Sequence, residues 1–170
     1  MTEIIWRPEW QLRPPEDLPF NPDGSLAFGE PVGNLTLPSD YLGFKRRAGA
    51  AALRDRGSWF LARFDDGTLL CEIAWLGSWR SVRLGTLNYN SDPDPADRCL
   101  PPIFVSIGYA EPGPMDVVMN VEQGDPDFGK VYVWFPSHDP WMTGTNTREL
   151  GFVANSFADF MNNLARREAL

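Results

Sequence analysis

The sequence predicts an α+β protein in which helices flank an antiparallel twisted β-sheet of about six strands. Three observations predict this class: a helix with its own start signals near residue 37, short strands with tight turns between residues 58 and 135, and a capped amphipathic helix near residue 156. Short turns between neighbouring strands are typical of an antiparallel meander. We therefore expect the helices to pack on a sheet built mainly from sequential strands.

The composition is that of a globular protein. A chain of 170 residues can bury a core without metals or disulfides, and its 43% hydrophobic residues include seven Trp and eleven Phe. We expect a Pro-rich extended arm over residues 1–36, packed on the domain, and a single α+β domain over residues 37–170.

Proline density predicts the arm. Each proline removes a backbone donor and fixes φ, and six of them interrupt this segment: Pro8, Pro14, Pro15, Pro19, Pro22 and Pro31. The arm also carries four large apolar side chains, Trp6, Trp10, Phe20 and Phe28. We expect them to be tucked against the domain, and a disordered tail is the alternative.

The first helix is predicted to open at Leu37-Pro38-Ser39-Asp40-Tyr41 and to end near Gly49. Pro38 suits the first helical position, and the acidic Asp40 complements the N-terminal end of the helix dipole. A basic trio, Lys45-Arg46-Arg47, falls in the last turn. Because cations stabilise the carbonyl end of a helix, we interpret this trio as a helix terminus and not as a phosphate site.

Strand patterns follow. Residues 59–64 and 68–75 flank Asp65-Asp66-Gly67, which predicts a tight hairpin. The other predicted strands are residues 82–87, 103–109, 116–121 and 130–135, and residues 88–102 are predicted to form an acidic, Pro-rich loop.

The last helix carries the best local signal. Ser156 is an N-cap residue with Asp159 three positions later, close in form to a capping box. Phe157, Phe160, Met161 and Leu164 fall on one face at helical spacing. Arg166 and Arg167 are expected at its C-terminal end.

Five short motifs stand in order along these elements: Leu37-Pro38-Ser39-Asp40-Tyr41, Ile107-Gly108, Gly129-Lys130-Val131-Tyr132-Val133-Trp134, His138-Asp139 and Ala154-Asn155-Ser156-Phe157-Ala158-Asp159-Phe160. Their order and spacing resemble the SUKH superfamily, which includes the fungal cell-wall-assembly regulators and many bacterial immunity proteins. The sequence departs from the usual pattern in its Pro-rich arm, which stands where members carry another helix. The resemblance implies a SUKH-like fold.

Charge limits the partners. The net charge is -8 and the pI about 4.6, which disfavours direct binding of nucleic acid because phosphate contacts require Lys and Arg. A basic protein partner is compatible with this balance. No stretch is long and apolar enough to span a membrane, and the N-terminus has no export leader, so we expect a reducing cytoplasm. Of the two cysteines, Cys71 is expected to be a buried free thiol and Cys99 falls in the acidic loop.

The pattern of reactive residues favours a protein that is not an enzyme and holds no metal or cofactor. One His and two distant Cys do not furnish the common zinc or nucleophile sites. Ser137-His138-Asp139 has the residue types of a hydrolytic triad, but consecutive residues do not converge as a relay, so a turn is expected. The Asp clusters lack EF-hand spacing.

The resemblance implies an immunity protein, which binds a cognate secreted polymorphic toxin and blocks its active site; many such toxins are nucleases. The residues expected to bind the partner are Asp92, Asp94, Asp97, Asp125 and Asp127, with Trp141 as an aromatic anchor. The alternative interpretation without a binding role is that the Asp residues are only solvent-exposed turn residues and that Trp141 belongs to the core. A regulatory adaptor of the cell-wall-assembly type is the alternative function, and an enzyme on this fold ranks third.

Overall fold

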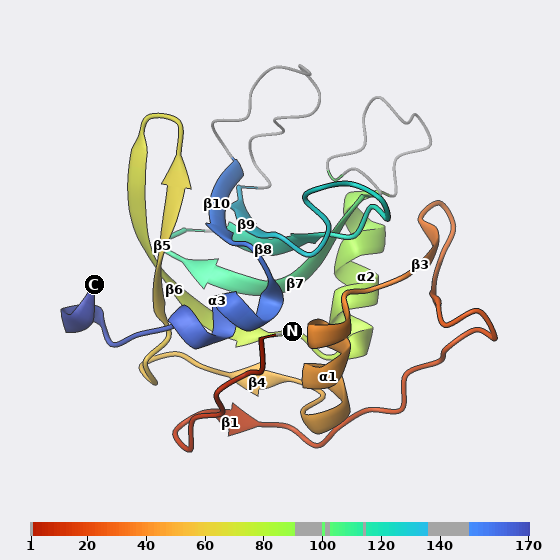
Figure 1. Cartoon of the computed structure of the whole chain (residues 1–170), viewed down its shortest axis with the longest axis horizontal. Helices are drawn as coiled ribbons and strands as arrows, with labels where there is room; N and C mark the ends of the chain where they lie inside the picture. Colours follow the sequence, from red (N-terminus) through yellow and green to blue (C-terminus); the bar gives the residue numbers. More distant parts are fainter. Residues whose placement is uncertain (1, 91–99, 101–102, 114, 136–149) are drawn as a thin grey trace.

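The computed structural model describes residues 2–90, 100, 103–113, 115–135 and 150–170, and over these residues the chain is an α+β protein with antiparallel strand pairs (Figure 1). The predicted fold class is confirmed at this level.

The described strands close into a barrel, a feature that the predicted antiparallel twisted sheet does not include. Six strands form it: β5 (Trp59–Phe64), β6 (Gly67–Leu76), β7 (Phe104–Glu111), β8 (Met115–Asn120), β9 (Val131–Trp134) and β10 (Leu150–Ala154). Their order is β6-β5-β10-β9-β8-β7, and β7 pairs back onto β6. Closure depends on β6, because its ten residues extend beyond β5 and its second half pairs with β7, as at Leu76↔Gly108.

Most predicted strands are confirmed. β5 and β6 form the expected hairpin around Asp65-Asp66-Gly67, and β7, β8 and β9 form the expected meander. Strand β10 was not predicted, because Gly151 interrupts its pattern. The ring of Phe64 lies over this glycine, where a Cβ atom would come within 2.5 Å of the ring.

The prediction of a strand at residues 82–87 is wrong. These residues lie in helix α2 (Trp79–Tyr89). The Ser78 hydroxyl caps the helix by accepting from the Ser81 amide at 3.2 Å, and Val82 and Thr86 are buried four residues apart on one face. Residues 82–87 alternate polar and apolar side chains over too few positions to distinguish a strand, with its period of two, from a helix. The Ser78 cap upstream of this run determines that it is helical.

Residues of the predicted arm form regular pairs. Strand β1 (Gln11–Leu12) pairs with β4 (Ala51–Ala52), which extends the sheet from β6, and β2 (Leu26–Gly29) pairs with β3 (Gly33–Leu35). The arm's aromatics differ in burial: Trp10 and Phe28 are buried in the core and Trp6 stacks on Phe44 at 5.6 Å, but Phe20 is 41% exposed.

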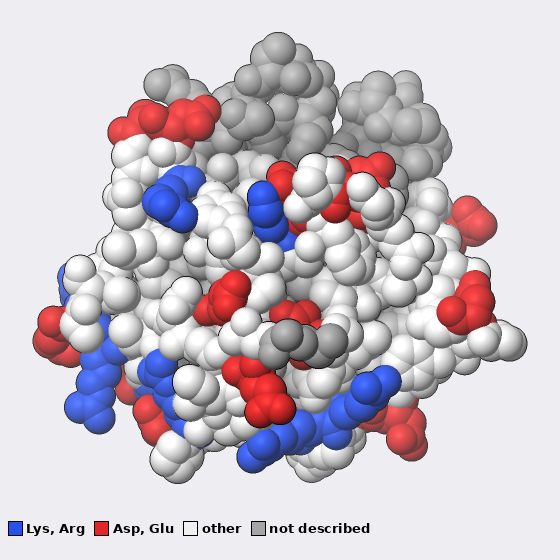
Figure 2. All heavy atoms as spheres, in the orientation of Figure 1, with Lys and Arg blue, Asp and Glu red and all other residues white. Residues whose placement is uncertain are grey.

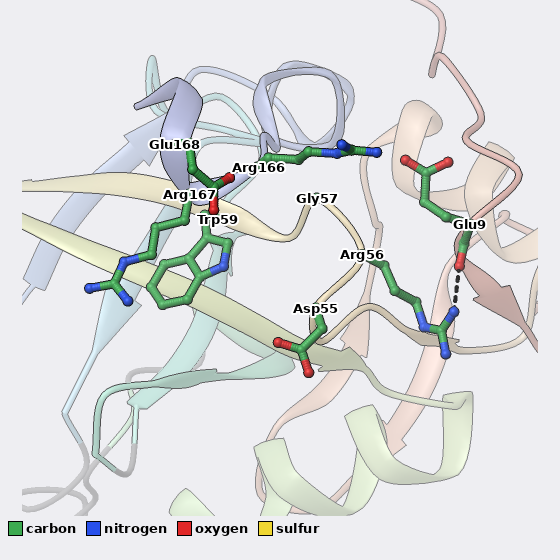
Figure 3. A pocket seen from close by; sticks show the side chains of 8 residues that line it. All are labelled: Glu9, Asp55, Arg56, Gly57, Trp59, Arg166, Arg167 and Glu168. Atoms are coloured by element: carbon green, nitrogen blue, oxygen red, sulfur yellow. Dashed lines mark hydrogen bonds between the residues drawn. The ribbon is translucent and has the colours of Figure 1, made fainter.

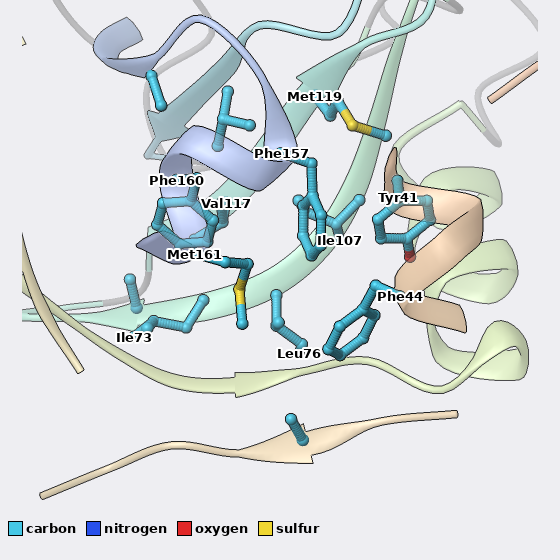
Figure 4. Packing of buried hydrophobic residues seen from close by; sticks show 14 of the residues in the cluster. Tyr41, Phe44, Ile73, Leu76, Ile107, Val117, Met119, Phe157, Phe160 and Met161 are labelled. Atoms are coloured by element: carbon cyan, nitrogen blue, oxygen red, sulfur yellow. The ribbon is translucent and has the colours of Figure 1, made fainter. Parts of the chain in front are cut away.

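The core lies between the inner face of the sheet and two helices, α1 (Ser39–Arg47) and α3 (Phe157–Asn163) (Figure 4). The predicted cap of the last helix is confirmed, because the Ser156 hydroxyl accepts from the Asp159 amide at 3.1 Å. The Asp40 carboxylate accepts from the Ala158 amide at 2.8 Å and so links α1 to α3. The prediction that Arg166 and Arg167 lie at the C-terminal end of α3 is wrong. They follow the helix, and Arg167 begins the short 3-10 helix η2 (Arg167–Ala169).

The outer face of the sheet carries a second apolar cluster. Tyr132 and Trp134 point to it, opposite to the core residues Val131 and Val133, as the alternation along this strand predicts. The other buried members are Leu100, Phe104 and Val118, and Tyr89 of α2 packs on them. Helix α2 thus covers the outer face while α1 and α3 cover the inner one.

The basic trio is divided by burial. Arg46 and Arg47 are exposed at the end of α1, but Lys45 is only 1% exposed. Its ammonium group donates to the Gly49 carbonyl at 2.6 Å and to the Gly77 carbonyl. Through the hydrogen bond to Gly77, Lys45 therefore links the end of α1 to the junction between β6 and α2.

Burial lowers the pKa of Lys45 from 10.5 to about 8, and the charge of Glu16 opposes this shift. Between these values the unfolded chain holds a proton that the folded protein has released, so stability rises with pH. We expect the free energy of unfolding to rise by about 1 kcal/mol between pH 8 and 9. Urea titrations at several pH values measure it.

The matched variant is Lys45→Met, which should lose this rise. Burial also raises the pKa of Cys71 from 9.0 to about 12, and from about pH 8 upward this shift lowers the stability of both proteins equally, so the difference between them reports on Lys45. Equal slopes for the two proteins between pH 8 and 9 would contradict the assignment to Lys45.

Candidate functional site

The turn between β8 and β9 contains two of the predicted partner-binding residues. Asp125 closes the turn: its carboxylate accepts from the Asp127 amide at 2.6 Å, and its carbonyl accepts from the Phe128 amide at 3.0 Å. These bonds are typical of an Asx turn. Asp125 therefore has a local structural role as well as a charge.

Asp127 forms the contacts that hold the turn on β9. Lys130 pairs with its carboxylate at 2.5 Å, and the Tyr132 hydroxyl donates to it at 3.2 Å. The hydrogen bond from Lys130 lowers the pKa of Asp127, while burial and then the charge of Asp127 raise the pKa of Tyr132 to about 12. Asp127 is thus ionised at neutral pH, and Lys130 offsets part of its charge.

A second acidic turn lies at the opposite end of the barrel, because β5 and β8 run in opposite directions. It is the β5–β6 turn with Asp65 and Asp66 (Figure 1). Acidic side chains are visible over both turns in Figure 2. We call these two turns, residues 64–67 and 121–130, the acidic turns. Together their sequences have five carboxylates and a single Lys: Asp65, Asp66, Glu122, Asp125, Asp127 and Lys130.

The remaining predicted partner-binding residues, Asp92, Asp94, Asp97 and Trp141, lie outside the described residues. So does the Ser137-His138-Asp139 segment. The residues that border these segments, Leu100 and Leu150, contact the outer apolar cluster. Of the predicted set, the structure therefore brings together only Asp125 and Asp127.

A carboxylate that the sequence analysis did not single out is Asp116, on the outer face of β8. It accepts from the Tyr89 hydroxyl at 2.6 Å and from the Ser106 hydroxyl at 2.7 Å. Burial raises the pKa of Asp116, and these two hydrogen bonds oppose the shift. The group ties α2 to β7 and β8. Its signal in the sequence is a lone Asp inside the apolar strand Met115–Asn120.

Two further observations concern chemistry. Cys71 is a buried free thiol, as predicted, and burial raises its pKa to about 12, so it stays protonated at neutral pH. Among the described residues, no three His, Cys, Asp or Glu side chains are grouped so that they could hold a metal ion.

Comparison with known proteins gives no relative: no family model, no curated protein and no solved structure matches the chain. Within the described part of the chain, no helix has the length and apolar character that crossing a membrane requires.

Proposed function

We propose that this chain is an immunity protein, which binds a cognate secreted toxin in the cytoplasm and masks its active site. The observation that carries the proposal is the pair of acidic turns, which present carboxylates on the face of the molecule seen in Figure 2. A basic toxin, such as a nuclease that binds phosphates, has the complementary charge. The resemblance to the SUKH superfamily supports the same function.

Within this proposal the barrel is a rigid support and the acidic turn between β8 and β9 is the contact surface. The Asp127–Lys130 pair and the bonds of Asp125 hold one turn in place, so its charges are fixed before the partner arrives. Exposed Glu122 and Asp66 add charge that attracts a basic surface over a distance. The proposed interface also includes four residues for which only the sequence gives support: Asp92, Asp94, Asp97 and Trp141.

Coexpression with the product of the neighbouring gene tests the function. We expect a stable complex and rescue of growth when that product is toxic. A complex without toxicity or rescue would favour the regulatory adaptor, and neither complex nor rescue would remove the proposal.

A charge variant tests the surface. Glu122→Gln/Asp125→Asn should slow association with the toxin by about 3- to 10-fold at low salt and weaken its salt dependence, because steering depends on these charges. The Asn side chain keeps the oxygen that closes the turn. Stopped-flow fluorescence measures the association rate constant.

The control removes the same charge elsewhere. Glu3→Gln/Asp17→Asn alters two exposed carboxylates of the arm and should leave the rate nearly unchanged. Equal rates for the two double variants would exclude the β8–β9 turn from the interface.

A further inference from the structure

A short segment near the N-terminus lies across α1 and α3, the two helices that cover the inner face of the sheet (Figure 1). We call this segment, residues 3–7, the strap. The strap belongs to no helix or strand. It is held instead by contacts with a few side chains and carbonyl groups of the two helices, and these contacts define a groove.

Asn162 of α3 binds the backbone of the strap. Its amide nitrogen donates to the Glu3 carbonyl at 2.8 Å, and its amide oxygen accepts from the Ile5 amide at 2.7 Å. A side-chain amide has both a donor and an acceptor, so it pairs with an extended backbone as a neighbouring strand would. Because these two bonds involve only backbone groups of the strap, they suit any extended peptide.

Two side chains of the strap have partners of their own. The Trp6 ring stacks on Phe44 of α1, with ring centres 5.6 Å apart and planes inclined by 4°, and the Arg47 guanidinium lies 4.2 Å from the centre of the Trp6 ring. Arg7 donates to the carbonyl of Leu164, the residue that ends α3. Carbonyls at a helix end lack partners within the helix and favour cations. The groove therefore selects a Trp followed by an Arg.

The strap does not fill the space beside α1. A hollow of about 450 Å³ lies between them, and its α1 side is formed by Ser39, Asp40, Gly43 and Arg47. A Cβ atom added to Gly43 would meet nothing within 4 Å. The groove thus has room for an occupant that is bulkier than the strap.

The strap is fastened less firmly than the residues that follow it. Both hydrogen bonds between the Asn162 side chain and the strap are exposed, so water replaces them at low cost. The next residues are held separately: Arg56 donates to the Glu9 carbonyl at 3.0 Å (Figure 3), Trp10 is buried, and β1 pairs with β4. Release of the strap therefore leaves the rest of the arm in place.

We propose that the strap occupies a peptide-binding groove, from which an extended segment of a partner protein displaces it. That segment has the pattern of residues 4–7, an apolar residue two positions before Trp-Arg. The partner competes with the strap, so its apparent affinity is reduced by the fraction of molecules whose groove is open. The groove lies on α1 and α3, away from the acidic turns, so the proposal does not rest on toxin binding.

Fluorescence anisotropy with a labelled peptide of residues 2–8 tests this competition on the full chain. We expect saturable binding, and none for a scrambled peptide. Trp6→Ala in the protein weakens the strap and should strengthen peptide binding at least about fivefold, whereas the same change in the peptide should weaken binding at least about fivefold. Ile5→Ala in the protein is the control, because this side chain is 68% exposed, and it should leave the affinity unchanged.

A second substitution locates the bound peptide. In the Trp6→Ala protein, Asn162→Leu removes both bonds to the peptide backbone and should weaken binding at least about fivefold. Asn163→Leu makes the same change at the next, exposed residue of α3 and should not weaken it.

Arg7→Gln in the protein provides an independent opening of the groove that keeps the aromatic contacts, and it should also strengthen peptide binding; urea unfolding verifies that each variant is folded. Unchanged affinity in both Trp6→Ala and Arg7→Gln, or no peptide binding by any of these proteins, would overturn the proposal. Dimers of the intact protein that the peptide dissociates, measured by sedimentation velocity, would also overturn it, because they would assign the groove to exchange of straps between two copies.

Discussion

Phe157→Ala is expected to lower the free energy of unfolding by about 3–5 kcal/mol, which is the usual range for truncation of a buried Phe. Phe157 is fully buried at the first turn of α3. Its ring contacts Tyr41 at 4.9 Å and Phe44 at 5.3 Å, so it joins α3 to α1 above the inner face of the sheet (Figure 4). Urea unfolding followed by tryptophan fluorescence measures the loss.

Phe20→Ala is the matched control, because it removes the same atoms from a side chain that is 41% exposed. The expected loss is below about 1 kcal/mol. Similar losses for the two variants would show that α3 does not depend on this aromatic contact.

The elements that could be predicted from the sequence are those whose causes are local. The hairpin follows from Asp65-Asp66-Gly67, and the last helix follows from the Ser156 cap and its apolar face. Each signal lies within a few residues of the structure that it determines. The alternation of Val131, Tyr132, Val133 and Trp134 likewise needs only the period of a strand.

The closed barrel could not be predicted in this way. It depends on pairing between β6 and β7, which are separated in the chain by α2 and the segment that follows it. The same limit applies to α2 itself, whose short alternating run fits two periods, and to β10, whose position beside β5 is fixed by a single pair, Phe152↔Arg63. Partners distant in sequence determine these features.

The candidate sites show a related limit. Carboxylates in turns, such as Asp125 and Asp127, are visible in the sequence because turn residues mark them. Glu72, Lys45 and Asp116 gave no comparable signal, since what distinguishes them is burial together with hydrogen bonds to distant segments. The depression beside Trp59 likewise joins three segments, near residues 9, 55–59 and 166–168, that only the folded chain brings together (Figure 3).

Closure of the barrel can be tested at a single glycine. Gly108→Ala should lower the free energy of unfolding by about 3 kcal/mol, the upper part of the range for overpacking. An added Cβ would lie 2.6 Å from the Trp75 carbonyl oxygen and 3.2 Å from the side chains of Ile73 and Leu76. Because the first of these atoms is backbone, β6 and β7 must separate. Chemical denaturation measures the loss.

A second readout distinguishes opening of this seam from general destabilisation. The Gly77 amide donates to the Ile107 carbonyl at 2.9 Å beside the seam, so its hydrogen exchange should accelerate in Gly108→Ala more than that of the β5–β6 hairpin. Gly43→Ala is the control: nothing lies within 4 Å of its added Cβ, and a helical Gly to Ala change should stabilise by about 1 kcal/mol. If Gly108→Ala were as stable as the parent, the pairing of β6 with β7 would not be what closes the sheet.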